Sequence, residues 1–154
     1  MVLLGVVLAG GLACRGSRSG PGLTVVLPDG GELNRRTIGP GAVFLFWSPQ
    51  SPPSQVLQAE VARLAELENH QRIRFFSVVA GRSNPGGPPP PATKGLEAVQ
   101  DTNRLLTQKF GIEVVPTIVV LDSDCRVTAR LEGYSPAVVQ TLETTLIELG
   151  KRSE

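Results

Sequence analysis

An unbroken apolar run that leads straight into a turn and a helix constrains the fold of this chain more than any other feature. Residues 42–47, Ala-Val-Phe-Leu-Phe-Trp, are all apolar or aromatic, which is typical of a strand buried on both faces of a sheet. A turn rich in serine and proline follows. From Ser54 to about Asn69, apolar residues then recur at helical spacing: Leu57, Val61, Leu64 and Leu67. A buried strand followed directly by an amphipathic helix predicts an α/β domain.

Shorter signals on both sides of this unit give the remaining elements. The turn Pro28-Asp-Gly-Gly31 predicts a hairpin between residues 23–27 and 32–34. The later pattern predicts a buried strand, a helix that begins at Lys94 or Asp101 and ends at Lys109, a strand pair, and a last helix capped by Ser135. The three strands are expected over 73–79, 117–121 and 127–132. This order predicts an α/β fold with a central mixed β-sheet, helices on both faces and an N-terminal β-hairpin extension.

Length, charge and cysteine usage restrict the kind of protein. A chain of 154 residues has room for one compact domain, which we place over residues 23–150. The formal net charge is +1, so we expect no nucleic-acid partner. The single histidine, His70, and two distant cysteines, Cys14 and Cys125, give no metal-ligand spacing. We therefore expect neither a metal nor a cofactor.

The N-terminal segment predicts export from the cytoplasm. Residues 2–13 are apolar or glycine, which is typical of a signal-peptide core and too short for a comfortable membrane span. Gly11-Leu-Ala-Cys14 resembles a bacterial lipobox, in which Cys14 would be lipidated, although Gly11 replaces the usual leucine and no Lys or Arg precedes the run. Cleavage after Ala13 without lipidation, or an uncleaved anchor or misplaced start, are the alternatives. Residues 15–22 are expected to form a flexible tether.

Four short segments match motifs of one family. Phe46-Trp-Ser-Pro-Gln-Ser-Pro-Pro-Ser54 resembles a strand-to-helix motif, Phe-Trp-Ala-x-Trp-Cys-x-Pro-Cys, and Phe110-Gly-Ile-Glu-Val-Val-Pro-Thr117 resembles Tyr-x-Val-x-x-x-Pro-Thr. Val120-Leu-Asp-Ser-Asp-Cys-Arg-Val127 is similar to a hairpin with glycine at the place of Cys125, and Pro28-Asp-Gly-Gly31 matches an N-terminal hairpin. Over about residues 22–150, the chain thus resembles the thioredoxin-like superfamily, in particular its periplasmic TlpA/ResA-like branch of thiol-disulfide oxidoreductases.

The resemblance puts Ser51 and Ser54 where the family has its two active-site cysteines. The family's chemistry needs a thiolate that ionises near neutral pH and exchanges sulfur–sulfur bonds. A serine hydroxyl stays protonated and forms no such bond, so the resemblance implies a redox-inactive domain with the sequence Ser-Pro-Pro-Ser in place of Cys-x-x-Cys. Serine is also among the best N-cap residues, and either serine is expected to cap the helix.

The resemblance also implies a binding groove that needs no cysteine. Pro116 corresponds to the family's cis-proline, and the backbone just before it offers hydrogen bonds to an extended substrate segment by strand addition. We expect Trp47, Pro53, Val115, Pro116 and Thr117 to frame this groove. The alternative is that these residues only maintain the fold. The expected partner is an extended peptide or a protein of the cell envelope, with the domain held at the membrane through its N-terminus.

Two other functions stay open at this point. One is a divergent thiol-disulfide oxidoreductase that uses Cys125, which predicts a thiol of depressed pKa. The other is that the chain is a Cys-to-Ser variant of an active enzyme. In each case the expected location is the periplasm or the outer face of the cytoplasmic membrane.

Overall fold

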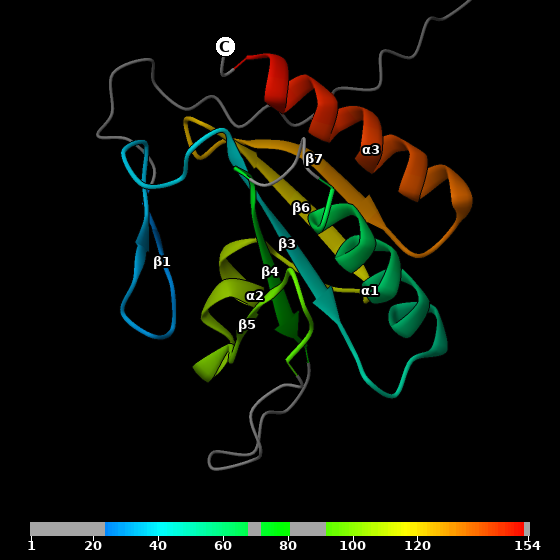
Figure 1. Cartoon of the computed structure of the whole chain (residues 1–154). Helices are drawn as coiled ribbons and strands as arrows, with labels where there is room; N and C mark the ends of the chain where they lie inside the picture. Colours follow the sequence, from blue (N-terminus) through cyan, green and yellow to red (C-terminus); the bar gives the residue numbers. More distant parts are fainter. Residues whose placement is uncertain (1–23, 68–71, 81–91, 153–154) are drawn as a thin grey trace, which may run out of the picture.

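A mixed sheet of five strands forms the centre of the computed structural model, which describes residues 24–67, 72–80 and 92–152 (Figure 1). The strand order is β5-β4-β3-β6-β7. The central strand β3 pairs in parallel with β4, which pairs in parallel with β5, and β3 pairs antiparallel with β6, which pairs antiparallel with β7. The strand bounds are β3 Gly41–Trp47, β4 Arg74–Val79, β5 Glu97–Val99, β6 Thr117–Asp122 and β7 Val127–Glu132.

Helices cover both faces of this sheet, as the sequence predicts. On one face, α1 Pro52–Ala65 and α3 Pro136–Lys151 pack against Val43, Leu45 and Trp47 (Figure 1). The opposite face carries Phe44 and Phe46 beneath the short helix α2, Leu105–Lys109, and a separate hairpin of β1 Val25–Val26 and β2 Glu32–Leu33. All of β3 is buried, because alternate side chains of this strand enter the two cores. The predicted fold class is therefore confirmed.

The first helix is shorter than the sequence predicts. It begins at Pro52, two residues before Ser54, and ends at Ala65 with Glu66 as its C-cap. Leu67 therefore lies beyond the helix and is 38% exposed. The prediction that it belongs to the apolar side of this helix is wrong. A helix can begin with proline because the first helical N–H groups have no partner inside the helix.

The region between residues 92 and 109 also differs from the prediction. Where a helix beginning at Lys94 was an alternative, the chain forms the edge strand β5 and then a short 3₁₀ turn, η2, over Thr102–Arg104. Asn103 and Arg104 both have positive φ, 57°, so a continuous helix is impossible through these residues. The helix starts only at Leu105, and the Asp101 carboxylate accepts hydrogen bonds from the backbone N–H groups of Leu106 and Thr107.

The strand register brings several chain segments to one edge of the sheet, the edge at which β3 ends. Phe46 of β3 lies opposite Val78 and Thr117, and Thr117 lies opposite Glu132 at the end of β7. The β3–α1 turn, the residues just before β6 and the β7–α3 loop are therefore neighbours at this edge. At the opposite edge, where β3 begins, Gly41 lies opposite Asp122.

Some sequence predictions fall outside the described residues. These are the signal or anchor segment with Cys14 and the tether over residues 15–22. His70 and the four consecutive prolines of residues 88–91 lie outside the described residues too. Within the part that the structure describes, no helix has the length and apolar character needed to cross a membrane.

Candidate functional site

Ser51 caps the helix that follows β3. Its backbone is extended, and its side-chain oxygen accepts a hydrogen bond from the N–H of Ser54 at 3.4 Å. Pro52 and Pro53 occupy the first helical positions and have no N–H to donate. The first three helical residues, Pro52, Pro53 and Ser54, therefore offer no free N–H to a ligand. Of the two serines, Ser51 is the cap and Ser54 is not.

Ser54 lies one helical turn further on and is completely buried, at 0% exposure. Its Oγ has no hydrogen-bond partner among the described residues. A buried hydroxyl without a partner is uncommon in proteins and costs stability. A thiol at the same position would lose little, because cysteine behaves as a small apolar residue with a weak donor. The environment of Ser54 thus suits sulfur better than oxygen.

Trp47 lies in the core under α1, where it is only 3% exposed. Its indole Nε1 donates a hydrogen bond of 2.7 Å to Oγ of Ser77 on the neighbouring strand β4. The structure therefore places Trp47 beneath the candidate site as a support, and not on its surface as the groove prediction implies. Pro53, by contrast, is exposed on the first turn of α1.

The segment before β6 contains one residue, Val115, whose main chain is unpaired among the described residues. The Val115–Pro116 peptide bond is cis, the buried Thr117 donates its hydroxyl hydrogen to the carbonyl of Val114 at 2.7 Å, and the carbonyl of Pro116 accepts from the N–H of Gly133 at 2.8 Å. Among the described residues, the N–H and C=O groups of Val115 make no hydrogen bond. Val115 is half-buried, and its main chain has the unpaired groups that strand addition uses.

The register places this segment beside the serine turn. Because Thr117 pairs with Phe46, Pro116 and Val115 precede β6 at the edge where Trp47 ends β3 and the turn to Ser51 begins. The structure thus brings Ser51, Pro53 and Val115 to one edge of the sheet, where Pro116, Trp47 and Thr117 are buried.

Exposed apolar residues at the same edge were missed from the sequence. Val56, Val114 and Tyr134 are 45%, 49% and 40% exposed. Val56 follows Pro53 by three positions and therefore shares its side of α1, and Tyr134 follows Gly133, which is bonded to Pro116. The spacing of Pro53 and Val56 was the available signal, but an amphipathic pattern does not show which apolar residues stay uncovered.

Cys125 lies far from this edge, in the turn after β6. It is 3% exposed and packs in the core under the hairpin face. Burial raises the pKa of its thiol, and the nearby carboxylates of Asp122 and Asp124 raise this pKa further. Its φ of 58° is in the left-handed region that glycine favours, which agrees with the glycine of the matching hairpin motif.

No metal-binding group accompanies the serines in the described part of the chain. Among these residues, no group of His, Cys, Asp and Glu is placed to hold a metal ion. The buried carboxylate of Asp101 is committed to α2, since it also accepts the hydroxyl hydrogen of Thr107 at 2.6 Å.

The mixed sheet, the helix that starts directly after the central strand, and the proline beside that start define a thioredoxin-like α/β protein. The family model described as a thioredoxin-like domain matches residues 35–145, and the chain belongs to this family. A comparison with the curated proteins gives no match.

Solved structures share the fold at low sequence identity. The pneumococcal exposed lipoprotein thioredoxin Etrx1 from Streptococcus pneumoniae strain TIGR4 is 16% identical with a TM-score of 0.61, over 82% of this chain and 98% of that one. A putative thiol:disulfide interchange protein DsbE from Chlorobium tepidum is 14% identical with a TM-score of 0.60, over 83% and 92%. StoA from Bacillus subtilis is 13% identical with a TM-score of 0.56, over 79% and 93%.

Proposed function

We propose that this thioredoxin-like domain binds an extended segment of a protein partner and performs no dithiol–disulfide exchange. In this proposal the chain is a member of the TlpA/ResA-like branch in which Ser51 and Ser54 occupy the two cysteine positions. The observation that carries it is the β3–α1 junction, where hydroxyl groups stand at the first turn of the helix beside Pro116.

Both serines support the loss of redox chemistry. The hydroxyl of Ser51 is used as a helix cap, and the Oγ of Ser54 is buried with no partner in the part of the chain that the structure describes. Among the described residues, neither hydroxyl donates a hydrogen bond to a carboxylate or an imidazole that could activate it. A site that keeps an unsatisfied hydroxyl where sulfur fits better is what a Cys-to-Ser exchange leaves behind, whether natural or introduced.

The oxidoreductase that would depend on Cys125 has little support. Such an enzyme needs an accessible thiol of lowered pKa. Cys125 is buried, its pKa is raised, and the turn that holds it is at the sheet edge opposite Ser51. A thiol in this state is an inert core residue.

The unpaired main chain of Val115 supports peptide binding. An N–H and a C=O group that are free of internal partners can bond to an extended ligand in the manner of a paired strand. The exposed side chains of Val114, Val56 and Tyr134 supply apolar surface around it. Main-chain bonds give affinity without requiring a particular ligand sequence, and the apolar surroundings add side-chain contacts.

We also propose that the domain is exported and held at the membrane surface through its N-terminus, with Cys14 as the site of lipidation. The lipobox-like segment supports this proposal, and one structural neighbour is an exposed lipoprotein.

Titration of the isotope-labelled full chain with capped random heptapeptides tests peptide binding. We expect chemical-shift changes at the backbone amides of Val115 and Thr117, and we expect them to disappear when the peptide backbone is N-methylated, because the ligand then loses its donors. Shifts that are unchanged by N-methylation, or no shifts at Val115, would contradict binding by strand addition.

A further inference from the structure

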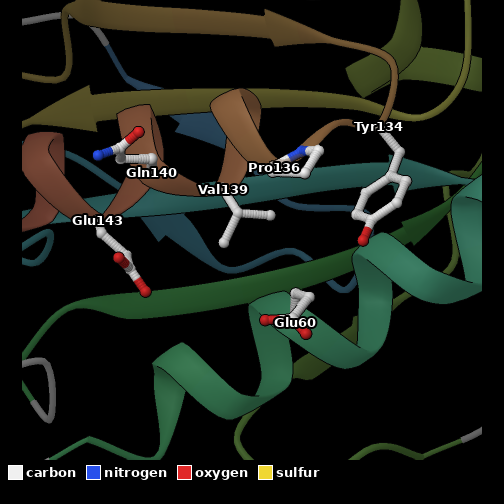
Figure 2. A pocket seen from close by; sticks show the side chains of 6 residues that line it. All are labelled: Glu60, Tyr134, Pro136, Val139, Gln140 and Glu143. Carbon is white, nitrogen blue, oxygen red and sulfur yellow. The ribbon is translucent and has the colours of Figure 1, made fainter.

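A cavity of about 430 Å³ lies between the middle of α1 and the start of α3 (Figure 2). Its wall comes from α1, from the β7–α3 loop and from the first turns of α3. Figure 2 shows the Tyr134 hydroxyl directed toward α1 and the Glu143 carboxylate directed toward the same space. The lining residues are Glu60, Tyr134, Pro136, Val139, Gln140 and Glu143.

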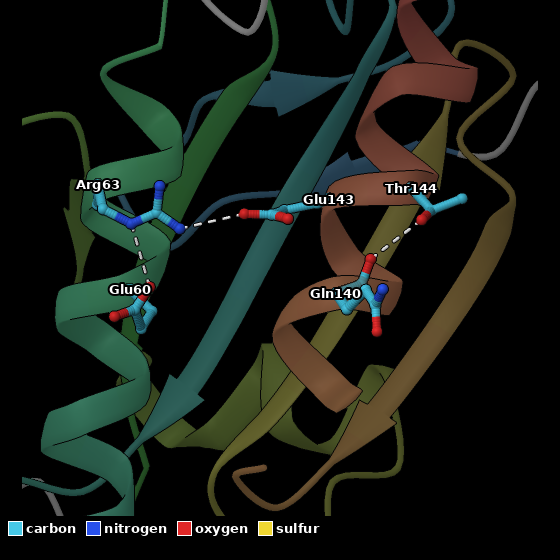
Figure 3. Close-up of polar contacts among 5 residues, drawn as sticks. All are labelled: Glu60, Arg63, Gln140, Glu143 and Thr144. Atoms are coloured by element: carbon cyan, nitrogen blue, oxygen red, sulfur yellow. Dashed lines mark hydrogen bonds and ion pairs between the residues drawn. The ribbon is translucent and has the colours of Figure 1, made fainter. Parts of the chain in front are cut away.

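The cavity has a negative wall. Its charged lining residues are both glutamates, one from each helix. Arg63 binds one oxygen of each, with Nε 3.1 Å from Glu60 Oε2 and Nη2 3.1 Å from Glu143 Oε1 (Figure 3). One guanidinium offsets one of the two negative charges and holds both carboxylates in place. The second oxygen of each carboxylate accepts no hydrogen bond from any described residue, so a donor entering the cavity can use it.

The remaining wall is apolar and aromatic. The ring of Tyr134 is partly exposed, and Pro136 and Val139 lie next to it on the first turns of α3. An aromatic face attracts a cation, and apolar surface accommodates the methylene stem of a long basic side chain. Lysine and arginine combine a positive charge with a methylene stem, whereas an acidic side chain would be repelled by the two carboxylates.

The cavity continues the proposed peptide groove. Tyr134 follows Gly133, whose N–H bonds to the carbonyl of Pro116 at 2.8 Å. On α1, Pro53, Val56 and Glu60 are spaced by three and four residues, so they form one stripe that leads from the groove to the cavity. A peptide paired with Val115 therefore has the cavity beside its path.

We propose that this cavity binds a lysine or arginine side chain of the extended peptide that pairs with Val115. This inference rests on the proposed peptide-binding function and adds a specificity to it: the preferred partner segment carries a basic residue at a fixed distance from its paired main chain.

Peptide pools with one fixed residue test the inference. Capped heptapeptides carry arginine at each position in turn, with lysine and arginine omitted from the random positions, and matched pools carry the neutral isostere citrulline. We expect the best arginine pool to bind the labelled full chain about tenfold more tightly than its citrulline match, with shifts at the amides of both Val115 and Tyr134. The advantage should decrease as salt is added.

Charge variants distinguish binding in the cavity from a general electrostatic attraction between arginine and the protein. Glu60→Gln/Glu143→Gln removes both cavity carboxylates and should abolish the arginine advantage. Glu32→Gln/Glu148→Gln removes the same charge from exposed positions outside the cavity and should leave it unchanged.

The outcomes distinguish this inference from the function on which it rests. Shifts at Val115 that are equal for arginine and citrulline, or an advantage that survives in Glu60→Gln/Glu143→Gln, would overturn the cavity assignment and leave the groove. Arginine-dependent shifts at Tyr134 without any at Val115 would overturn the shared peptide and the proposed groove.

Discussion

At the scale of single residues, Ser51 and Ser54 have opposite effects on the stability of one helix. The hydroxyl of Ser51 accepts a backbone N–H that would otherwise have no partner at the start of α1. The hydroxyl of Ser54 has lost its hydrogen bonds to water and gained none from the described residues. The position of each serine therefore decides its effect, since the same side chain stabilises the fold at the helix cap and destabilises it in the core.

Replacement of the cap should weaken the fold. We expect Ser51→Ala to lower the free energy of unfolding by about 1 kcal/mol, because the N–H of Ser54 loses its acceptor. Urea unfolding of the full chain measures this difference. Ser123→Ala, in the exposed β6–β7 turn, is the control and should stay within about 0.5 kcal/mol of the parent. An equally stable Ser51→Ala would show that the cap contributes nothing.

Replacement of the buried serine should strengthen the fold. We expect Ser54→Ala to raise the free energy of unfolding by about 1 kcal/mol, because it removes an unsatisfied hydroxyl and introduces the best helix former. The same urea measurement gives the sign directly. A destabilised Ser54→Ala would mean that this hydroxyl has a partner.

The thiol of Cys125 should react slowly, with a pH dependence set by its raised pKa. In a Cys14→Ser background, we expect iodoacetamide labelling to increase only at a pH above that needed for a free cysteine, since the thiolate is the reactive form. Because the folded pKa exceeds the unfolded one, this group stabilises the fold below the unfolded pKa, and the contribution is lost as pH rises toward the folded value. Rapid labelling at mildly acidic pH would contradict this account.

At the scale of elements, long periodic segments and the hairpin marked by its turn were predictable, whereas the short elements between residues 97 and 109 were not. The run 42–47 could be recognised as the central strand because its side chains on both faces are apolar and must be buried. The edge strand β5 has only Val99 buried, so its sequence carries no strand pattern. The placement of α2 depends on the hydrogen bonds that the Asp101 carboxylate accepts and on two residues of positive φ, and neither feature produces a periodic apolar pattern. The motif positions of Ser51 and Pro116 could be read from the sequence, whereas the cavity at Glu60 and Glu143 depends on how two helices pack.

The β3–α1 junction should still accept a disulfide. In a background without Cys14 and Cys125, we expect Ser51→Cys/Ser54→Cys to oxidise in air to an intramolecular disulfide, because residues three apart on a helical turn have the Cα separation that a disulfide requires. Mass spectrometry after alkylation counts the remaining free thiols. The single variant Ser54→Cys should keep one free thiol. Two free thiols in the oxidised double variant would contradict the proposed equivalence with Cys-x-x-Cys.

At the scale of the whole molecule, the fold is shared with proteins that have little sequence in common with this chain. Etrx1, DsbE and StoA retain the architecture at 13–16% identity, because the pattern of buried positions fixes the layers and many sequences satisfy it. Chemistry depends on far fewer atoms, so the proposed exchange of sulfur for oxygen at two positions would remove an activity and leave the fold.

The proposed attachment to the membrane depends on the N-terminal segment, so it is tested on the full chain. When the protein is expressed in a bacterium that processes lipoproteins, we expect radiolabelled palmitate to be incorporated, because Cys14 lies in a lipobox-like segment. Cys14→Ser should abolish the label, and Cys125→Ser should retain it. A parent chain that takes up no label would favour simple secretion or an uncleaved anchor.

The reduction of insulin by dithiothreitol, followed by turbidity, tests the central claim most directly. The full chain and its Cys125→Ser variant should both precipitate insulin no faster than dithiothreitol alone, while an active thioredoxin in the same assay accelerates it. Acceleration by the full chain that persists in Cys125→Ser would show that this domain catalyses dithiol–disulfide exchange, contrary to the account given for Ser51 and Ser54.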